Sequence, residues 1–260
     1  MLSRNQVKFI HSLNQKKFRE IHHQFLAEGS KLILEMLGSS YKLESLYASE
    51  EWLNQNMGLL LLKKIPFTEI SESEMERITS LSSPSPVLAV AEIPEDQVNI
   101  GKLSGLVLVL DDIKDPGNLG TIIRIADWFG IRHIICSETT VDLYNPKVIQ
   151  STMGSFTRLS IIYLKIPDFL STLDPGTRIY GTFPEGENIY TKPLASEGII
   201  IIGSESAGIS HEVVNLVTDK ISIPSFPTAG GTVHAESLNA SVATAIICSE
   251  FRRRTNLFDV

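Results

Sequence analysis

Residues 106–110 read Leu-Val-Leu-Val-Leu and lead directly into the polar stretch Asp111-Asp112-Ile113-Lys114-Asp115-Pro116-Gly117-Asn118-Leu119-Gly120. A continuous apolar run of this length is typical of a strand buried on both faces, as in a parallel sheet flanked by helices. Helix-like segments separate most of the further runs of this kind, which lie at 131–136, 161–164, 179–182, 198–202 and 220–223. The pattern predicts an α/β fold with a parallel sheet for the second half of the chain.

The first 90 residues predict a smaller α/β unit. A helix at 30–37 is expected to have Ser30 as its N-cap and to stop at Gly38, because serine and glycine favour those positions. Further strands are predicted at 25–29, 43–48, 59–62 and 87–91, and further helices near 49–55 and 71–78.

Residues 92–104 are polar and carry no hydrophobic period. Segments of this composition usually connect domains. We therefore expect a first domain at 1–91, a linker at 92–104 and a second domain at 105–260.

The composition of the 260 residues, 43% hydrophobic and 20% charged, is that of a globular protein. No apolar run approaches the roughly 18–20 residues that span a bilayer, and the first six residues do not resemble a secretory signal. Cys136 and Cys248 have no second Cys or His at ligand spacing. These features predict a cytoplasmic protein with two buried structural cysteines and neither a disulfide nor a metal.

The charge of the chain, −7 in total, is unevenly distributed. Residues 1–42 contain seven Lys and Arg against three Glu, a balance of +4, and the remainder carries −11. A basic leading segment on an acidic body could be a localised phosphate-binding surface or simply the solvated face of a helix. Both interpretations remain open at this stage.

Three loops that follow predicted strands carry the candidate functional residues, because parallel sheets bind ligands beyond the carboxyl ends of their strands. In the first, Pro116-Gly117-Asn118 predicts a tight turn before a helix at 121–129. Arg124 follows Ile122 by two positions, which places it about 200° around that helix and away from the core. Taken alone, this pattern also fits a structural turn and an exposed arginine.

The second loop is Gly203-Ser204-Glu205-Ser206-Ala207-Gly208, and it matches neither a dinucleotide-binding fingerprint nor a P-loop. The third runs from Ile223-Pro224 to Ser237-Leu238-Asn239-Ala240-Ser241, ahead of an apolar helix. Ser237 or Asn239 could simply cap that helix.

Taken together and in this order, the three loops resemble the motif set of the SpoU (TrmH-like) family of the SPOUT methyltransferases. The stretch from Phe25 to Lys31, Phe-Leu-Ala-Glu-Gly-Ser-Lys, also resembles the start of that family's substrate-binding domain. The resemblance implies a C-terminal SPOUT domain with a trefoil knot, an N-terminal α/β RNA-binding domain, and a homodimer whose active site uses residues of both subunits.

The same resemblance implies S-adenosylmethionine as the cofactor, held largely through backbone groups of Gly203, Ile223 and Leu238, with Thr182 as a further candidate. It gives Arg124 the role of activating the ribose 2′-hydroxyl. Because arginine stays protonated in proteins, we expect it to orient the hydroxyl and stabilise the alkoxide. The remaining catalytic candidates, which would position the reacting groups, are Asn118, Glu205, Ser237 and Asn239. No metal is implied.

One departure from the family pattern concerns the segment Ser225–Glu236, which is longer than the family's usual link. Ser225 also stands where the family commonly has Met. The cofactor contacts of this segment are therefore open.

The expected function is transfer of methyl from S-adenosylmethionine to a ribose 2′-hydroxyl in RNA, with ribosomal RNA favoured over transfer RNA. The alternative is an RNA-binding protein that keeps the fold and has lost catalysis. A nucleotide-dependent enzyme acting on a small molecule is disfavoured, because the phosphate-binding fingerprints are missing.

Overall fold

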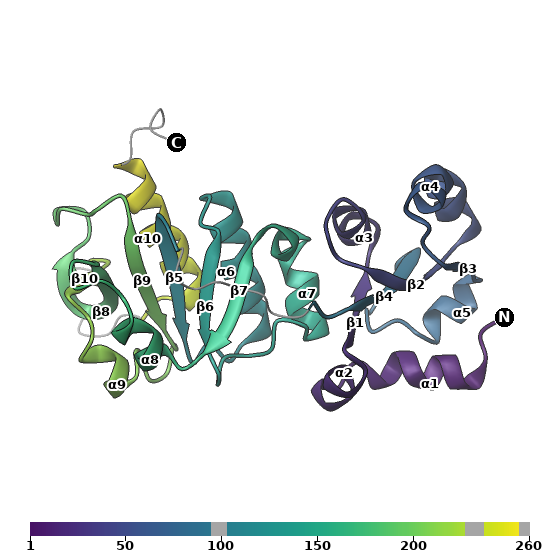
Figure 1. Cartoon of the computed structure of the whole chain (residues 1–260), viewed down its shortest axis with the longest axis horizontal. Coiled ribbons are helices and arrows are strands. Elements are labelled where there is room, and N and C mark those ends of the chain that lie inside the picture. The colour runs from purple at the N-terminus through teal and green to yellow at the C-terminus, as the bar shows by residue number, and fades with distance from the viewer. Residues whose placement is uncertain (95–102, 227–236, 255–260) are drawn as a thin grey trace. The chain divides into compact units, whose positions relative to one another are not determined.

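The computed structural model describes residues 1–94, 103–226 and 237–254. The chain divides into two compact units, and each is described by itself (Figure 1). The first comprises Met1–Asp96 with Asp142–Thr157, and the second comprises Gln97–Val141 with Arg158–Val260.

The second unit is built on a six-stranded sheet whose order is β10-β8-β9-β5-β6-β7 and whose printed pairs are all parallel. This arrangement confirms the predicted fold class. The strands are β5 (Leu106–Asp111), β6 (His133–Ser137), β7 (Ser160–Leu164), β8 (Ile179–Asn188), β9 (Gly198–Gly203) and β10 (Asp219–Ser222). The helices are α6 (Pro116–Trp128), α8 (Ile166–Ser171), α9 (His211–Val214) and α10 (Ala240–Arg253).

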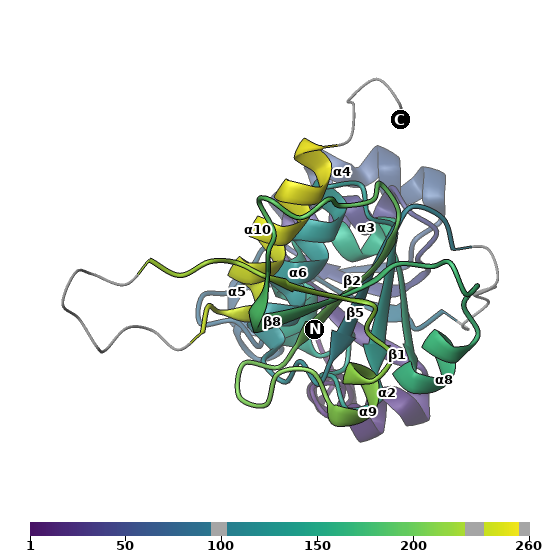
Figure 2. The same ribbon diagram turned by 90° about the vertical axis from the view of Figure 1, so that its left-hand side faces the viewer.

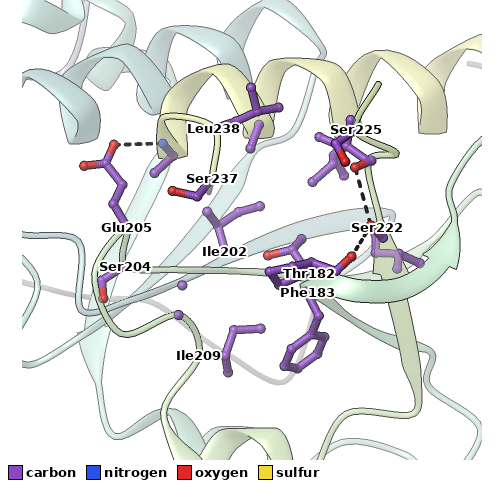
Figure 3. Close-up of a pocket in the computed structure, with 18 of the residues that line it drawn as sticks. Thr182, Phe183, Ile202, Ser204, Glu205, Ile209, Ser222, Ser225, Ser237 and Leu238 are labelled. Atoms are coloured by element: carbon purple, nitrogen blue, oxygen red, sulfur yellow. Dashed lines mark hydrogen bonds between the residues drawn. The ribbon is translucent and has the colours of Figure 1, made fainter. Parts of the chain in front are cut away.

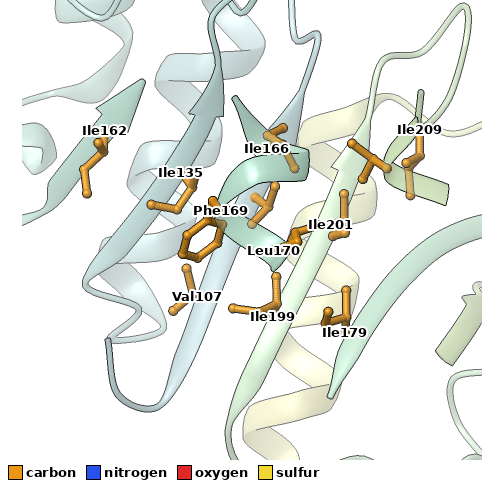
Figure 4. Close-up of a cluster of buried hydrophobic side chains, with 12 residues drawn as sticks. Val107, Ile135, Ile162, Ile166, Phe169, Leu170, Ile179, Ile199, Ile201 and Ile209 are labelled. Atoms are coloured by element: carbon orange, nitrogen blue, oxygen red, sulfur yellow. The ribbon is translucent and has the colours of Figure 1, made fainter. Parts of the chain in front are cut away.

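Helices cover both faces of this sheet, which explains the continuous apolar runs of its central strands. Val107 and Val109 of β5 face one side, where they share a buried cluster with Phe169 of α8 and Val213 of α9. Figure 4 shows Val107 and Phe169 in this cluster. Successive strand residues alternate between faces, so Leu108 and Leu110 point to the other side. There α6 and α10 pack against each other (Figure 2). Both faces of the central strands are therefore dry.

The first unit contains a four-stranded sheet of order β1-β4-β2-β3, in which β4 is antiparallel to both of its neighbours. The strands are β1 (Gln24–Glu28), β2 (Leu43–Ala48), β3 (Phe67–Glu69) and β4 (Val87–Glu92). The helices are α1 (Arg4–Ser12), α2 (Lys16–His22), α3 (Ser30–Leu37), α4 (Glu50–Lys63), α5 (Glu72–Glu76) and α7 (Pro146–Thr152).

Three local predictions were wrong. Leu59–Leu62, predicted as a strand, belongs to α4, where Leu61 and Leu62 are 64% and 78% exposed. A short apolar run does not by itself distinguish a helix from a strand. Here Ser49 caps a helix that starts at Glu50 and continues through the four leucines to Lys63. Ser30 is the first residue of α3 rather than its N-cap, a position held by Gly29 at φ 110°.

The third wrong prediction concerns Pro116-Gly117-Asn118, which forms the first turn of α6 rather than a tight turn before it. Asp115 caps this helix, because its carboxylate accepts a hydrogen bond from the Asn118 backbone N–H at 2.8 Å. Proline suits the first helical position, where its missing N–H would have no partner. Ile122 and Ala126 are buried, as predicted, and Arg124 is exposed.

Residues 142–157 pack with the first unit, although they lie inside the sequence range predicted for the second domain. Tyr144 stacks near Phe25 with ring centroids 4.7 Å apart, and Phe156 lies 4.9 Å from the ring of Tyr41. The predicted linker at 92–104 falls largely on residues 95–102, outside the described part of the chain. The domain boundaries therefore stay predictions.

An internal ion pair holds this segment to α2. Arg19 is 2% exposed, and its guanidinium lies 2.6 Å from the carboxylate of Asp142. The same side chain donates to the backbone oxygens of Leu13 and Asn14, each at 2.9 Å. All these acceptors would lose their partner together if the guanidinium were removed.

We expect Arg19→Met to destabilise the first unit by about 2–3 kcal/mol, because Asp142 and two carbonyls lose their donor in a largely buried site. The measurement is urea unfolding followed by tryptophan fluorescence. Lys16→Met is the matched control, since Lys16 makes only an exposed 3.7 Å ion pair with Glu20, and it should change stability by less than about 0.5 kcal/mol. Equal effects of the two variants would contradict the structural role of Arg19.

Candidate active site

The predicted site residues come from loops that leave the carboxyl ends of parallel strands. Asn118 follows β5, Glu205 follows β9, and Asn239 precedes α10. Parallel strands end at one edge of the sheet, so loops distant in sequence can meet there. The structure joins these three side chains directly.

Glu205 is the centre of this network. One of its carboxylate oxygens, Oε1, accepts hydrogen bonds from Asn118 Nδ2 at 3.0 Å and from Asn239 Nδ2 at 2.7 Å. The same oxygen accepts a third bond from the backbone N–H of Ala240 at 3.0 Å (Figure 3). A carboxylate at this position also interacts favourably with the positive end of the α10 dipole.

Asn239 serves two structural purposes with the two ends of one amide. Its Oδ1 caps α10 by accepting from the backbone N–H groups of Ser241 and Val242 at 3.0 and 3.3 Å. Its Nδ2 donates to Glu205 and, at 2.9 Å, to Oδ1 of Asn118. Capping by Asn239 is therefore confirmed, and it does not exclude the side chain from the site.

A cavity of about 990 Å³ opens beside this network (Figure 3). All four predicted cofactor residues line it: Thr182, Gly203, Ile223 and Leu238. Of the predicted catalytic residues, Glu205 and Ser237 line it as well. The structure thus brings the predicted cofactor residues to one cavity, with part of the hydrogen-bonded network at its rim.

Gly203 is required by the shape of the loop that borders this cavity. The loop folds back on itself, with two backbone hydrogen bonds between Ser204 and Gly208 at 2.9 and 3.1 Å. A Cβ on Gly203 would lie 2.2 Å from the carbonyl carbon of Gly208. Gly208 itself adopts a φ of +67°, which side chains rarely tolerate. The two glycines therefore permit a tight return of the backbone beside the cavity.

Arg124 lies apart from the hydrogen-bonded network. It is exposed on α6 and makes no hydrogen bond or ion pair with the residues that the structure describes. One helical turn further on, Trp128 is 85% exposed. The structure does not join Arg124 to the other predicted catalytic residues within one chain.

Sequence analysis missed a second cluster, at the ends of β5 and β6. Asp112 has a φ of +62°, and Lys114 Nζ lies 2.6 Å from its carboxylate and 2.7 Å from the backbone oxygen of Thr139. These contacts hold the pKa of Asp112 below its usual range, the Lys114 hydrogen bond contributing most. Asp111, 4% exposed, accepts from the backbone N–H of Ser210 at 2.7 Å. Two consecutive carboxylates directly after an apolar strand were the available signal.

The cavity suits S-adenosylmethionine in size and lining. Its volume lies at the upper end of the usual range for small-molecule sites, roughly 300–1,000 Å³. Isoleucine and phenylalanine side chains form an apolar wall, and several serine hydroxyls are available for polar groups. Ser225 lies in the lining, whereas 227–236 of the longer predicted segment fall outside the described residues.

Both cysteines are buried and free, as predicted. Burial raises the pKa of the Cys248 thiol to about 12 and raises that of Cys136 further. Over the described ranges, no cluster of three His, Cys, Asp or Glu side chains could hold a metal ion. Within the same ranges, no helix combines the length and apolar character needed to cross a bilayer.

Comparison with known proteins identifies both units. Residues 105–249 match the profile of the SpoU rRNA Methylase family, and residues 4–89 match that of the MRM3-like substrate binding domain. The chain is 29% identical over 248 residues to the 23S rRNA (guanosine(2553)-2′-O)-methyltransferase RlmP of Bacillus subtilis, with 95% of each chain covered.

Solved structures of RNA methyltransferases match the chain over nearly its whole length. A TrmH-family structure from Porphyromonas gingivalis superposes with a TM-score of 0.84 at 37% identity, covering 98% of this chain and 100% of that one. The AdoMet-bound rRNA methyltransferase of Sinorhizobium meliloti superposes with a TM-score of 0.85 at 28% identity, covering 98% and 97%. The chain therefore belongs to the SpoU rRNA methylase family and is an RNA 2′-O-ribose methyltransferase.

Proposed function

We propose that this protein transfers methyl from S-adenosylmethionine to a ribose 2′-hydroxyl of ribosomal RNA. The observation that carries the proposal is the hydrogen-bonded group of Asn118, Glu205 and Asn239 beside the cavity lined by the four predicted cofactor residues. The relatives from B. subtilis and S. meliloti, whose names specify rRNA, support the choice of substrate. A cytoplasmic location accords with this function.

The cofactor would be held by the loops that line the cavity. Gly203 at the end of β9 and Ile223 just after β10 offer backbone groups, and Leu238 ahead of α10 and Thr182 of β8 close the cavity. When bound, S-adenosylmethionine supplies a methyl group that its positive sulfur has already activated. The apolar wall formed by Ile202, Ile209 and Phe183 would keep water away from that group.

Arg124 would act on the ribose as a fixed cation. A guanidinium remains protonated in proteins, so it cannot serve as the base that removes the 2′-hydroxyl proton. It can orient the hydroxyl and stabilise the negative charge that develops on the oxygen during attack, while the neighbouring RNA phosphate would take up the proton. Ser237 and the amides of Asn118 and Asn239 would position the ribose and the neighbouring phosphate by hydrogen bonds.

The separation of Arg124 from the network supports a homodimer with a shared site. Arg124 and the 85% exposed Trp128 lie on the same side of α6, one turn apart. A large exposed aromatic side chain is a frequent anchor of protein interfaces. In this arrangement the Arg124 of one subunit faces the cavity of its partner. The C-terminal trefoil knot implied by the family belongs to the same proposal.

The first test is methyl transfer itself. Arg124→Ala should lower the rate by about 10²–10³, the effect of losing one transition-state donor. The measurement is transfer of radiolabelled methyl to protein-free large-subunit rRNA. Arg132→Ala removes the same charge from an exposed residue ahead of β6 and should leave the rate unchanged. A fully active Arg124→Ala variant would exclude the assigned role, and a wild-type chain that binds no S-adenosylmethionine would favour the RNA-binding alternative.

The cofactor site can be tested separately from catalysis. Gly203→Ala should weaken S-adenosylmethionine binding by about tenfold or more, because the new Cβ forces apart the backbone at the cavity's edge. Isothermal titration calorimetry measures the affinity. Gly176→Ala is the control, since a Cβ there would meet nothing within 4 Å. Unchanged affinity in the Gly203→Ala variant would place the cofactor elsewhere.

The shared site predicts complementation between two inactive variants. Arg124→Ala and Glu205→Ala chains with different tags should each be inactive, but their co-expression should restore about a quarter of wild-type activity. Random pairing makes half of the dimers mixed, and each mixed dimer has one of its two sites intact. Activity is compared in the mixture and in each separate protein. No recovery in mixed dimers isolated through both tags would show that Arg124 acts in its own subunit.

A further inference from the structure

The first 19 residues of the chain contain no carboxylate, although the whole sequence has 30 Asp and Glu. They carry Arg4, Lys8, Lys16, Lys17 and Arg19. Arg19 is internal and paired with Asp142, whereas the other four are exposed. The surface of α1 and the start of α2 is therefore positively charged, with its first acidic residue at Glu20.

The charges of α1 form a row along one face of the helix. Arg4 and Lys8 occupy positions i and i+4, which lie about 40° apart around a helix. The two charges are separated by about 6 Å along the helix axis, at 1.5 Å per residue. The imidazole of His11 follows on the same face, with its Nε2 2.7 Å from the backbone oxygen of Arg77. Ile10 of α1 is fully buried, as is Leu13 just beyond the helix, so the opposite face is fixed against the sheet. The orientation of the row thus follows from the packing of the core.

These cations are not neutralised within their own unit. Arg4, Lys8 and Lys17 make no ion pair or hydrogen bond through their side chains with any residue that the structure describes, and Lys16 has only the exposed contact with Glu20. Asn5 and Gln15, both exposed, add amide groups to the same region. Such amides commonly join Lys and Arg in contacts to phosphate and sugar.

A solvated helix face without a ligand usually mixes both signs of charge. The same unit offers a comparison in α5, whose exposed Glu72 and Glu76 lie close to Arg77 in sequence. The α1 row has no such mixture. Its apolar side is buried against the sheet, so α1 is not free to insert that side into a lipid surface. A linear polyanion fits a row of cations of this kind better than an isolated anion does.

We propose that the α1–α2 surface, formed by Arg4, Lys8, Lys16 and Lys17, binds the phosphate backbone of the RNA substrate. The identity of that RNA as the methylated substrate rests on the proposed function, but the binding itself does not. Contacts of this type are independent of sequence. The surface therefore supplies affinity and orientation, while the choice of nucleotide is made at the site beside Glu205.

The test compares two double variants of the full chain that remove the same charge from the same unit. Arg4→Gln/Lys8→Gln alters the α1 row, and Lys63→Gln/Lys64→Gln alters two exposed lysines at the end of α4. Binding to protein-free large-subunit rRNA is measured by filter retention between 50 and 250 mM KCl. An unrelated RNA of similar length is measured in parallel.

The α1 variant should bind both RNAs about 10- to 50-fold more weakly near 100 mM salt, and its slope of log affinity against log salt should fall by about 1.5. The α4 variant should match the wild-type chain. Wild-type affinity and salt slope in the α1 variant would overturn the proposal, as would an equal loss in the α4 variant. A loss confined to one RNA would also overturn it, because backbone contacts do not read sequence.

Two further measurements separate this proposal from the proposed function. The α1 variant should keep the wild-type affinity for S-adenosylmethionine and the wild-type unfolding midpoint. Neither changed side chain lines the cavity or contacts a hydrogen-bonding or ionic partner among the described residues. Its methyl-transfer KM for RNA should rise while kcat is retained. Suppose that neither the wild-type protein nor the α1 variant methylates RNA, but the difference in RNA affinity persists. The RNA-binding role of the α1–α2 surface would then be supported, and only the proposed methyl-transfer reaction would be contradicted.

Discussion

The site depends on one carboxylate oxygen that serves three donors. Oε1 of Glu205 accepts from Asn118, from Asn239 and from the backbone of Ala240, at distances of 2.7 to 3.0 Å. These donors belong to the start of α6, to the residue that caps α10 and to the first residue of α10 itself. A charged acceptor makes each of these bonds stronger than a neutral one would. The two helices that cover one face of the sheet are thereby fixed to the loop that borders the cavity.

The parallel sheet brings these hydrogen-bonded residues to one edge. Because β5, β8, β9 and β10 run in the same direction, the polar residues that follow them gather at one edge while the strands stay buried. Gly203 lets the β9 loop turn back within van der Waals distance of its own backbone, so main chain forms one edge of the cavity beside its apolar side chains. Backbone walls of this kind offer N–H and C=O groups at fixed positions, which suits a ligand recognised mainly through the backbone.

The positions of the sheet strands could largely be predicted from the sequence, whereas the packing and backbone conformation of the connecting segments could not. Apolar runs located the six parallel strands. The strand-end motifs grouped Asn118, Glu205 and Asn239, which the structure joins by hydrogen bonds, with Arg124, which it does not. The strand predicted at Leu59–Leu62 was wrong because a run of four leucines is compatible with a helix as well as with a strand. The packing of residues 142–157 with the first unit could not be predicted, since it depends on the Arg19–Asp142 ion pair and on ring contacts across more than 100 residues. The left-handed Asp112 likewise has no local signal that separates it from an ordinary aspartate.

The two groups of unpaired cations differ in how the fold presents them. The α1 row lies along an exposed helix whose other side is anchored in the core, so its charges can follow a flexible polyanion over several phosphates. Arg124 is a single guanidinium on α6, and α6 is held at its start by Asp115 and at its end by Arg252, which donates to the backbone oxygen of Phe129 at 2.7 Å. A helix fixed at both ends gives the backbone of Arg124 a defined position, which is what stabilisation of a developing alkoxide would require of it. Both helices are therefore anchored, and they differ in how the charge is arranged: several cations spread over α1 and the start of α2 suit a polyanion, whereas a single cation on α6 suits one developing charge.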